Sequence, residues 1–347
     1  MISRVADHCF WLGRYLDRAE STARLLQVTR ALAFDSEMPD MEVWRPLVTV
    51  SGQYPDFVAR FGRDAAANSE VVQRYMTWAT ENPVSVRSSI RAAREGARSI
   101  REVLSQEIWQ AINELFLWFS GEEASTQYVH DRDEVYRHVR RSTQLHLGLV
   151  RSTMLHDTAM DLLWLGVLLE RVGQTARILD MHHHILDGTG SQHQVLQTAL
   201  WLSLLRTCSG FDAFMRQHQG RVTQKSVVSF LIYENRFPRS LRYCVHSAVG
   251  VMGRIWSEAE GGVAADQIDG LRQLQELDDW LNDQHRLSTT PSIHELLTHV
   301  VDEISAICAA IHYNIAGEGQ RGRLLPSETP LPMQQSQSQL PSSSPTQ

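Results

Sequence analysis

The chain has 347 residues, of which 43% are hydrophobic and 21% are charged, and its formal net charge is -7. This composition supports a packed core and is not that of a disordered protein. The acidic balance argues against a general nucleic-acid binder, which needs a basic face to displace counterions. Lys225 is the only lysine, so a Walker phosphate loop and most other lysine-dependent mechanisms are excluded.

The N-terminal segment and the cysteines bear on the cellular compartment. Asp7, Arg14 and Asp17 interrupt the first apolar segment, which is therefore not expected to be the apolar core of a signal peptide. No stretch approaches the roughly 20 uninterrupted apolar residues of a membrane span. The four cysteines lie far apart in sequence, which favours buried thiols in a reducing compartment over a disulfide framework or a structural zinc site. We expect a cytoplasmic protein that does not interact with membranes.

Along the chain, apolar residues recur at three- and four-residue spacing, and no alternating strand pattern is convincing. The clearest periodic segments are 5–33, 84–103, 130–155, 159–186, 239–258 and 291–315. After Ile315 the sequence becomes rich in Gln, Ser and Pro, which predicts a disordered tail over 317–347. The sequence therefore predicts an all-α protein.

An internal repeat is the most informative feature of the sequence. The segments FWLGRYLDRAESTARLL (10–26) and LWLGVLLERVGQTARIL (163–179) are identical at nine of the 16 positions from Trp11 and Trp164 onward. Later landmarks keep nearly the same offset: Trp44 with Trp201, Ser51–Gly52 with Ser209–Gly210, Val71–Val72 with Val227–Val228, and Pro83 with Pro238. We predict a multi-helix bundle built from two homologous halves, 1–155 and 156–316, related by a pseudo-twofold axis.

The first helix of each half carries an arginine inside its apolar arc. At 100° per residue, Arg18 falls between Trp11 and Leu25, and Arg171 has the matching place in the second half. An unpaired buried guanidinium is very costly, and no acid lies one turn away from Arg18 on its own helix. Each arginine should therefore be buried and paired with an acid from another helix. The candidates are Glu95, Glu107 and the carboxylate at the Glu-Arg position of the opposite half.

Polar residues and a glycine occupy the flank of the same helices. In the first half these are Gly13, Asp17, Glu20 and Arg24, and in the second half Gly166, Glu170, Gly173 and Arg177. The missing side chain at Gly13 permits close helix approach or leaves room for a ligand. Two interpretations remain open, namely an ion-pair network that docks the halves and a polar pocket that binds an anionic or peptide-like ligand.

Arginines cluster near two further expected helix starts. Asn82 is expected to cap a helix that begins at Pro83, and this helix carries Arg87, Arg91, Arg94 and Arg98 with Glu95 between them. The corresponding start in the second half carries Arg236, Arg239 and Arg242. Helix N-termini with nearby arginines are plausible anion sites, although for any single arginine a solvated face is the simpler and favoured interpretation. The candidate pocket is formed by Asp17, Arg18, Glu20, Arg94, Glu95, Glu170, Arg171, Arg236 and Arg239.

Several catalytic and metal signals are rejected. GEGQRG at 317–322 fits a dinucleotide fingerprint by letter but lacks a preceding strand. His294 and His299 are five residues apart, about 140° on a helix, so they do not form a zinc pair. His182–His184 are adjacent and do not share a helix face. The sequence therefore predicts no metal and no cofactor, and it assigns no catalytic residue.

Four phrases, in order along residues 1–316, resemble the bacterial alpha-E family. These are WLGRYLDRAESTARLL, NPVSVRSSIRAAREGARSIREVLSQEIWQAINEL, VRRSTQLHLGLVRSTMLHD and FPRSLRYC. The family's Glu-Arg motif maps onto Asp17–Arg18 and Glu170–Arg171. The resemblance implies a helical protein that works beside a circularly permuted ATP-grasp ligase, with a transglutaminase-like peptidase as a further partner, in a system that forms and cleaves amide bonds.

Three functional hypotheses follow. The first is a non-catalytic or co-catalytic partner that binds the ligase or its peptide product, or an anionic small molecule. The second is an enzyme that uses Asp17, Glu20 and Glu170 as acid–base groups or metal ligands. The third is a structural adaptor.

Overall fold

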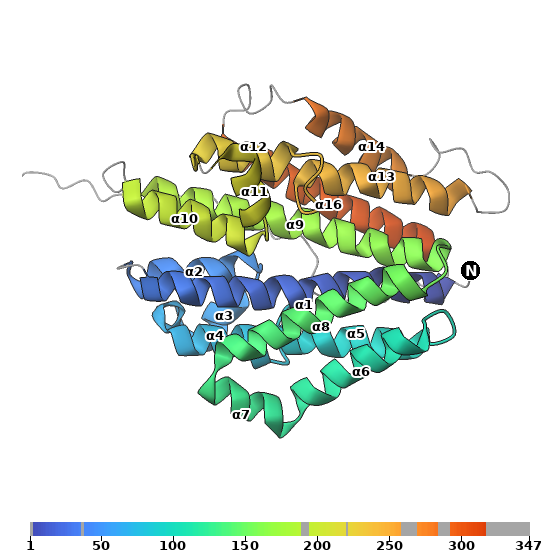
Figure 1. The fold of residues 1–347 in the computed structure, drawn as a ribbon, viewed down its shortest axis with the longest axis horizontal. Helices are drawn as coiled ribbons and strands as arrows, with labels where there is room; N and C mark the ends of the chain where they lie inside the picture. The colour runs from blue at the N-terminus through green and yellow to red at the C-terminus, as the bar shows by residue number, and fades with distance from the viewer. Residues whose placement is uncertain are drawn as a thin grey trace, which may run out of the picture.

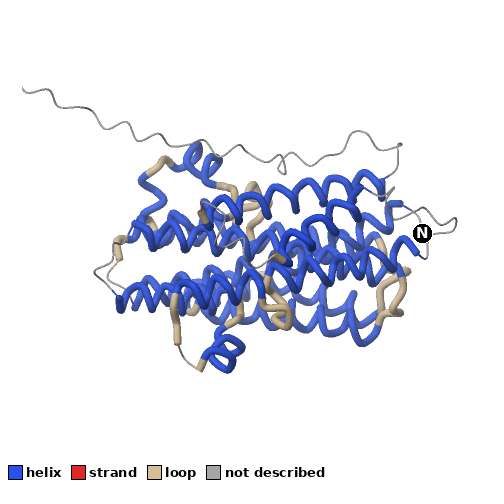
Figure 2. Tube along the Cα trace, turned by 90° about the horizontal axis from the view of Figure 1, so that it is seen from above, coloured by secondary structure: helices blue, strands red, loops and turns tan. Residues whose placement is uncertain are grey.

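A computed structural model describes residues 3–35, 38–188, 194–219, 221–257, 269–283 and 292–316. Within these ranges the regular structure is helical throughout and contains no strand, as Figure 2 shows. The all-α prediction is confirmed. The tail predicted for 317–347 lies outside the described residues. In the described part of the chain, no helix combines the length and apolar character needed to cross a membrane.

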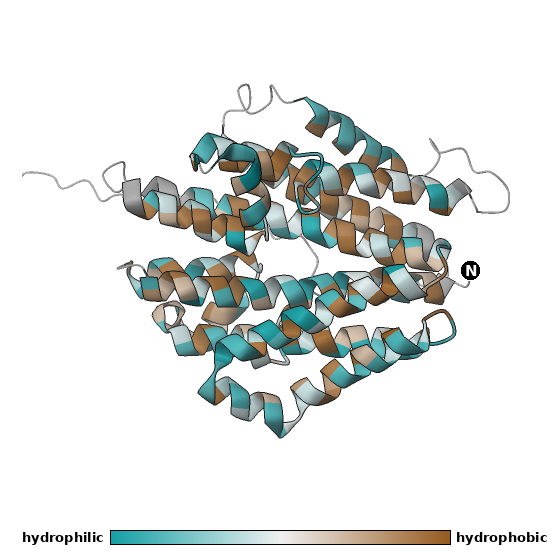
Figure 3. Cartoon of the chain, viewed as in Figure 1, coloured by the Kyte–Doolittle hydropathy of each residue, from teal (hydrophilic) through white to brown (hydrophobic). Residues whose placement is uncertain are grey.

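Two long helices, α1 (Ser3–Asp35) and α9 (Thr158–Gly188), lie side by side at the centre of the molecule (Figure 1). The predicted apolar stripe of α1 is buried: Leu12, Leu16, Ala19, Ala23 and Leu26 are each at most 2% exposed. Helices cover α1 and α9 on several sides, so each long helix buries more than one face. In Figure 3 hydrophilic residues line the visible side of the peripheral helix α8 (Arg132–Thr153).

Glycines allow the two long helices to touch. A Cβ atom at Gly13 would overlap the carbonyl oxygen of Leu163, and a Cβ atom at Gly166 would overlap the carbonyl oxygen of Phe10. Both positions therefore require glycine for the observed backbone approach. Of the two roles considered for Gly13, close helix approach is the observed one.

The helices that follow α1 and α9 occur in matching order. α5 (Val86–Ser99) and α8 pack against α1, and α6 (Gln106–Ser120) contacts α5 and α8. In the second half α13 (Leu241–Ser257) and α16 (Ile293–Ala316) pack against α9, and α14 (Asp269–Asn282) contacts both. The remaining elements of the first half are α2 (Asp40–Val50), α3 (Tyr54–Phe61), η1 (Asp64–Ala67), α4 (Ser69–Trp78) and α7 (Glu122–His130). Those of the second half are α10 (Gln194–Thr207), α11 (Phe211–His218) and α12 (Gln224–Tyr233).

The helix predicted to start at Pro83 begins at Val86 instead. The buried Asn82 accepts a hydrogen bond from the backbone N–H of Val84 at 3.0 Å and forms a turn. Ser85 is the cap, because its Oγ accepts from the N–H of Ser88 at 3.1 Å. The same Oγ donates to the carbonyl oxygen of Ala79 at 2.7 Å, which ties the turn to the preceding segment. The prediction that Asn82 caps this helix was therefore wrong.

The start of α13 repeats this arrangement. Ser240 Oγ accepts from the N–H of Tyr243 at 3.1 Å and donates to the carbonyl oxygen of Glu234 at 2.5 Å. α13 begins at Leu241, so each helix starts three residues after its landmark proline. The matched prolines thus mark two turns of the same construction.

The Ser-Gly landmark is offset by one residue in the structure. Gly52 has φ 75° and donates to the carbonyl oxygen of Thr49, while Ser209 has φ 57° and donates to the carbonyl oxygen of Arg206. In backbone conformation Gly52 therefore matches Ser209, and not Gly210 as the sequence alignment predicted. Ser209 adopts a left-handed conformation that carries no steric penalty only for glycine.

Candidate functional site

Two crossed ion pairs join α1 to α9. Arg18 Nε donates to Glu170 Oε1 at 2.7 Å, and Arg171 Nε donates to Asp17 Oδ1 at 2.9 Å. Arg18 and Arg171 are each only 8% exposed. The prediction that both arginines are buried and bonded to an acid outside their own helix is confirmed. Of the three candidates, the acid of the opposite half is the partner.

Glu170 accepts hydrogen bonds from two arginines and a glutamine. It is 1% exposed, and its donors besides Arg18 are Arg14 Nε at 2.9 Å and Gln174 Nε2 at 3.0 Å. Burial by itself raises the pKa of Glu170, but the adjacent Arg18 and Arg14 outweigh burial and hold the pKa well below its usual 4.5. Glu170 is therefore a fixed negative charge at neutral pH.

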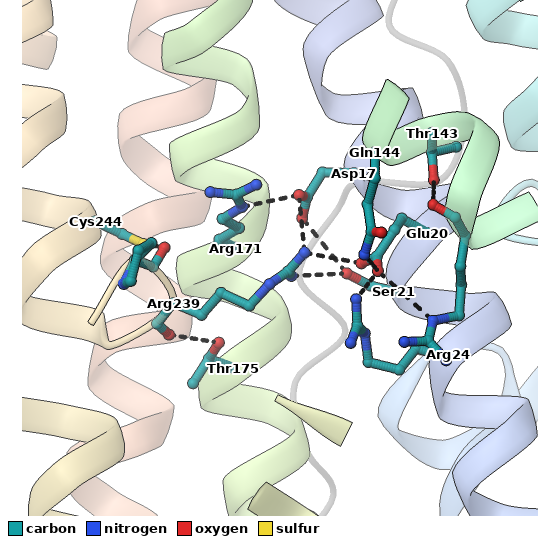
Figure 4. Close-up of polar contacts among 12 residues, drawn as sticks. Asp17, Glu20, Ser21, Arg24, Thr143, Gln144, Arg171, Thr175, Arg239 and Cys244 are labelled. Carbon is teal, nitrogen blue, oxygen red and sulfur yellow. Dashed lines mark hydrogen bonds and ion pairs between the residues drawn. The ribbon is translucent and has the colours of Figure 1, made fainter. Parts of the chain in front are cut away.

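Glu20 forms the centre of a second group of contacts, drawn in Figure 4. It is fully buried and pairs with Arg24 one turn further along α1. Arg239 NH2 donates to Glu20 Oε2 at 2.8 Å, and from α8 Gln144 Nε2 donates to Glu20 Oε1 at 3.4 Å. Arg140 Nε lies 3.9 Å from Glu20 Oε1. Side chains from α1, from α8 and from the turn before α13 thus converge on this carboxylate.

Arg239 connects the two halves from the turn that precedes α13. Its guanidinium also lies 3.6 Å from Asp17 Oδ1 and donates to Ser21 Oγ at 3.5 Å. Its carbonyl oxygen accepts from Thr175 Oγ1 of α9 at 3.0 Å (Figure 4). The turn is therefore fixed to α9 while the side chain reaches the acids of α1.

Three residues of the predicted pocket lie elsewhere. Arg94 pairs with Glu95 at 2.5 Å and donates to Asn113 on α6 at 3.3 Å. The side chain of Arg236 is 77% exposed and pairs with Glu234 at 3.0 Å. Arg94 contacts α6, Glu95 pairs with arginines of its own helix, and Arg236 points to solvent from its turn, so these three are not part of the cluster. The six other predicted residues are brought together.

The predicted pocket omitted four members of the cluster: Arg14, Arg24, Arg140 and Gln144. Arg14 lies one turn before Arg18, so helix geometry places it on the same side of α1. Arg140 and Gln144 are likewise one turn apart on α8, and their spacing was the available signal. Nothing in the sequence distinguishes them from the solvated polar face of an amphipathic helix.

A surface hollow of about 240 Å³ lies between α5 and α6, apart from this cluster. It is lined by Thr80, Arg87, Ile90, Arg91, Phe116, Phe119 and Ser120. Two arginines of the predicted cationic stripe therefore border it. Neither Glu170 nor Glu20 contributes to its lining.

Among the described residues, no group of three or more His, Cys, Asp or Glu side chains is arranged to hold a metal ion. His294 Nδ1 instead contacts Asp180 Oδ1 at 2.8 Å and joins α16 to α9. The ring of His299 lies 4.6 Å from that of Trp280. These two histidines thus have separate packing roles.

A family model described as a predicted alpha-helical domain with a conserved ER motif matches residues 1–315. The chain belongs to the Alpha-E family. Its only Glu-Arg dipeptide is Glu170–Arg171. The carboxylate of Glu170 accepts a hydrogen bond from Arg18, and the guanidinium of Arg171 donates one to Asp17. In this Alpha-E protein the motif therefore lies at the contact between the two long helices.

The chain is also similar to proteins described only as uncharacterised, one from Mycobacterium bovis and two from Mycobacterium tuberculosis. Each is 24% identical over 265 residues, which cover 69% of this chain and 28% of the relative. The Alpha-E chain thus matches little more than a quarter of the length of these relatives. No solved structure matches it.

Proposed function

We propose that this Alpha-E protein is a non-catalytic binding component of an amide-ligase system, in which it binds an ATP-grasp ligase or that ligase's peptide product. The observation that carries this proposal is the state of the three central acids. Asp17, Glu20 and Glu170 each contact at least one arginine, and each is at most 1% exposed. The arginines therefore hold these three carboxylates in fixed positions.

Paired acids favour binding over acid–base catalysis. A carboxylic acid that transfers protons near neutral pH needs a pKa raised toward the working pH. The arginines around Glu170 move its pKa in the opposite direction. Asp17 and Glu20 are likewise occupied by Arg171 and Arg239. These contacts disfavour the alternative of an enzyme that uses the three acids as its catalytic groups.

We also infer that the halves 1–155 and 156–316 are two copies of one helical unit related by a pseudo-twofold axis. Reciprocal contacts support this inference: Gly13 approaches Leu163 as Gly166 approaches Phe10, and these pairs share one sequence offset. The capped turns at Ser85 and Ser240 also match. Each half covers the long helix of the other, so the two function as one domain.

The relatives support a role beside other domains. The mycobacterial proteins continue well beyond the part that matches this chain, as expected of a module that works next to another activity. By family resemblance the proposed partners are a circularly permuted ATP-grasp ligase and, second, a transglutaminase-like peptidase, in the cytoplasm.

The test is copurification of this protein with a circularly permuted ATP-grasp protein from the same genome, followed by an amide-ligation assay with and without the Alpha-E chain. We expect a stable complex, or a ligation rate or product that depends on this chain. Glu170→Gln protein that remains folded serves as the control for acid catalysis and should retain most of the stimulation. Absence of both a complex and any effect on ligation would contradict the proposal.

A further inference from the structure

The buried cluster between the halves contains more positive than negative charge. In the described part of the chain, the carboxylates of Asp17 and Glu20 are surrounded by the guanidiniums of Arg24, Arg140, Arg171 and Arg239. Buried charge of one sign is costly unless it is compensated. Among the described residues, this excess of positive charge favours the binding of a further negative group.

The uncompensated charge is concentrated around Arg24. This side chain is 6% exposed, and its Nε donates to no acceptor among the described residues. Burial, followed by the neighbouring Arg239 and Arg140, lowers the pKa of Arg24 from 12.5 to about 8. Glu20 is in contact with Arg24 and Arg239 and lies 3.9 Å from Arg140, so three guanidiniums share this one carboxylate.

Arg140 presents a second free donor to the same place. Its Nε is buried and has no hydrogen-bond acceptor in the described part of the chain, since the nearest oxygen of Glu20 is 3.9 Å away. The whole side chain is 26% exposed, and that of Arg239 is 14% exposed. Arg24 is thus the most buried of these three guanidiniums, and Arg140 and Arg239 are partly exposed to solvent.

We propose that Arg24, Arg140 and Arg239 form a binding site for an oxyanion, either a carboxylate or a phosphate group of a ligand. Guanidinium groups bind such anions through paired, charge-assisted hydrogen bonds. Glu20 occupies part of this site from within the chain and competes with the ligand for the same donors. This inference rests on the proposed binding role, because it names the chemical group by which the ligand is held.

The two halves differ at this point, which places the site on one side of the molecule. The repeat position of Glu20 is Gly173, and the guanidinium of Arg177 lies 3.2 Å from where a Cβ atom of Gly173 would be. The positive charge of Arg177 also lowers the pKa of Glu170. The second copy therefore has no counterpart of the Glu20 group, and one oxyanion site per chain is expected.

The experiment is isothermal titration of the full-length protein with inorganic phosphate and, separately, with a triglutamate peptide, at low chloride. At least one probe should bind with saturation and a stoichiometry of one. Arg140→Gln should weaken that binding about tenfold or more, the effect of losing a charge-assisted hydrogen bond. Glu20→Gln should strengthen it, because the internal competitor is neutralised. The matched control is Arg91→Gln on the exposed side of α5, which should bind as the wild type does.

The two probes separate the sources of the oxyanion. Saturable binding of phosphate alone assigns a phosphate-bearing ligand, and binding of the peptide alone or of both assigns a carboxylate. Circular dichroism checks that each variant is folded. If Arg140→Gln is not folded, it is replaced by Arg140→Lys, which keeps the positive charge but loses the guanidinium Nε. Absence of binding by both probes, or equal binding by Arg140→Gln and wild type, overturns the site. Ligase stimulation without anion binding would reject this inference alone and leave the proposed function standing.

Discussion

Arg18 on α1 holds Glu170 on α9 by two hydrogen bonds, from Nε to Oε1 at 2.7 Å and from NH2 to Oε2 at 2.9 Å. Both oxygens of the carboxylate are therefore engaged by one planar group, which fixes its orientation. In this chain the Glu-Arg motif thus serves in part to join the two long helices.

Removal of this arginine should destabilise the protein strongly. Arg18→Met keeps much of the side-chain volume but leaves the buried Glu170 without its bidentate partner, and we expect a loss of about 3–5 kcal/mol in the free energy of unfolding. Arg60→Met is the matched control, because the Arg60–Glu81 pair is largely exposed and its loss should cost about 1 kcal/mol or less. Urea denaturation measures both. Equal small losses would show that the Arg18 pair contributes little.

Acid should weaken the same contact. The pKa of Glu170 lies below 4.5 in the folded chain because of Arg18 and Arg14, so the unfolded chain takes up this proton first as the pH falls. The contribution of Glu170 is therefore fully present above pH 4.5 and is lost as the pH falls toward the folded pKa. The difference in unfolding free energy between wild type and Glu170→Gln should be constant near neutral pH and shrink in acid. A difference that widened in acid would reverse the inferred sign.

The contact between the two long helices should not tolerate a methyl group. Gly13→Ala places a Cβ atom against the backbone of Leu163, which cannot rotate away as a side chain can. We expect a loss of about 3 kcal/mol or more, at the upper end for overpacking. Gly148→Ala in α8 meets nothing within 4 Å and should instead stabilise the helix by about 0.5–1 kcal/mol. Thermal melts of the two variants should shift in opposite directions.

The two capped turns should respond alike. Ser85→Ala and Ser240→Ala each remove a helix cap and a hydrogen bond to the preceding segment, so each should cost about 1–2 kcal/mol. Ser152→Ala, at an exposed site on α8, should change stability by about 0.5 kcal/mol at most. Urea denaturation provides the comparison, and a large effect at only one of the two caps would weaken the case for equivalent halves.

The apolar arcs of α1 and α9 were sufficient to predict that Arg18 and Arg171 are buried. The helix period puts each guanidinium in the core, and the cost of an unpaired buried charge then requires an acid. The choice among Glu95, Glu107 and the opposite carboxylate depends on which helix packs against α1. That choice is settled by the close approach at Gly13, which a single helix pattern does not specify.

The sequence pattern could not distinguish the exposed Arg236 from the inward-pointing Arg239. Both lie in the non-helical turn before α13, three residues apart, where no periodicity indicates which side chain points inward. The side chain of Arg236 is 77% exposed, whereas that of Arg239 is 14% exposed and reaches Glu20. The path of the turn, fixed by Ser240 and by Thr175, makes the difference.

Arg140 could not be selected from the sequence for a different reason. It lies on an amphipathic helix among several other arginines, and only the docking of α8 against α1 separates the inward-facing arginine from its solvated neighbours. The contacts of Arg140 with Gln27 at 2.5 Å and with Glu20 are products of that docking.

The close approach at Gly13 and Gly166 also determines how the crossed ion pairs respond to ionic strength and temperature. The backbones meet one turn from Asp17 and Glu170, which are 0% and 1% exposed. Dissolved ions screen charges that water reaches, over about 10 Å at 0.1 M salt, but they screen buried pairs much less. The penalty for removing charge from water also falls on heating. The ion pairs between α1 and α9 should therefore persist in concentrated salt, and their contribution to stability should increase at high temperature. Exposed pairs such as Arg60–Glu81 should contribute almost nothing under these conditions.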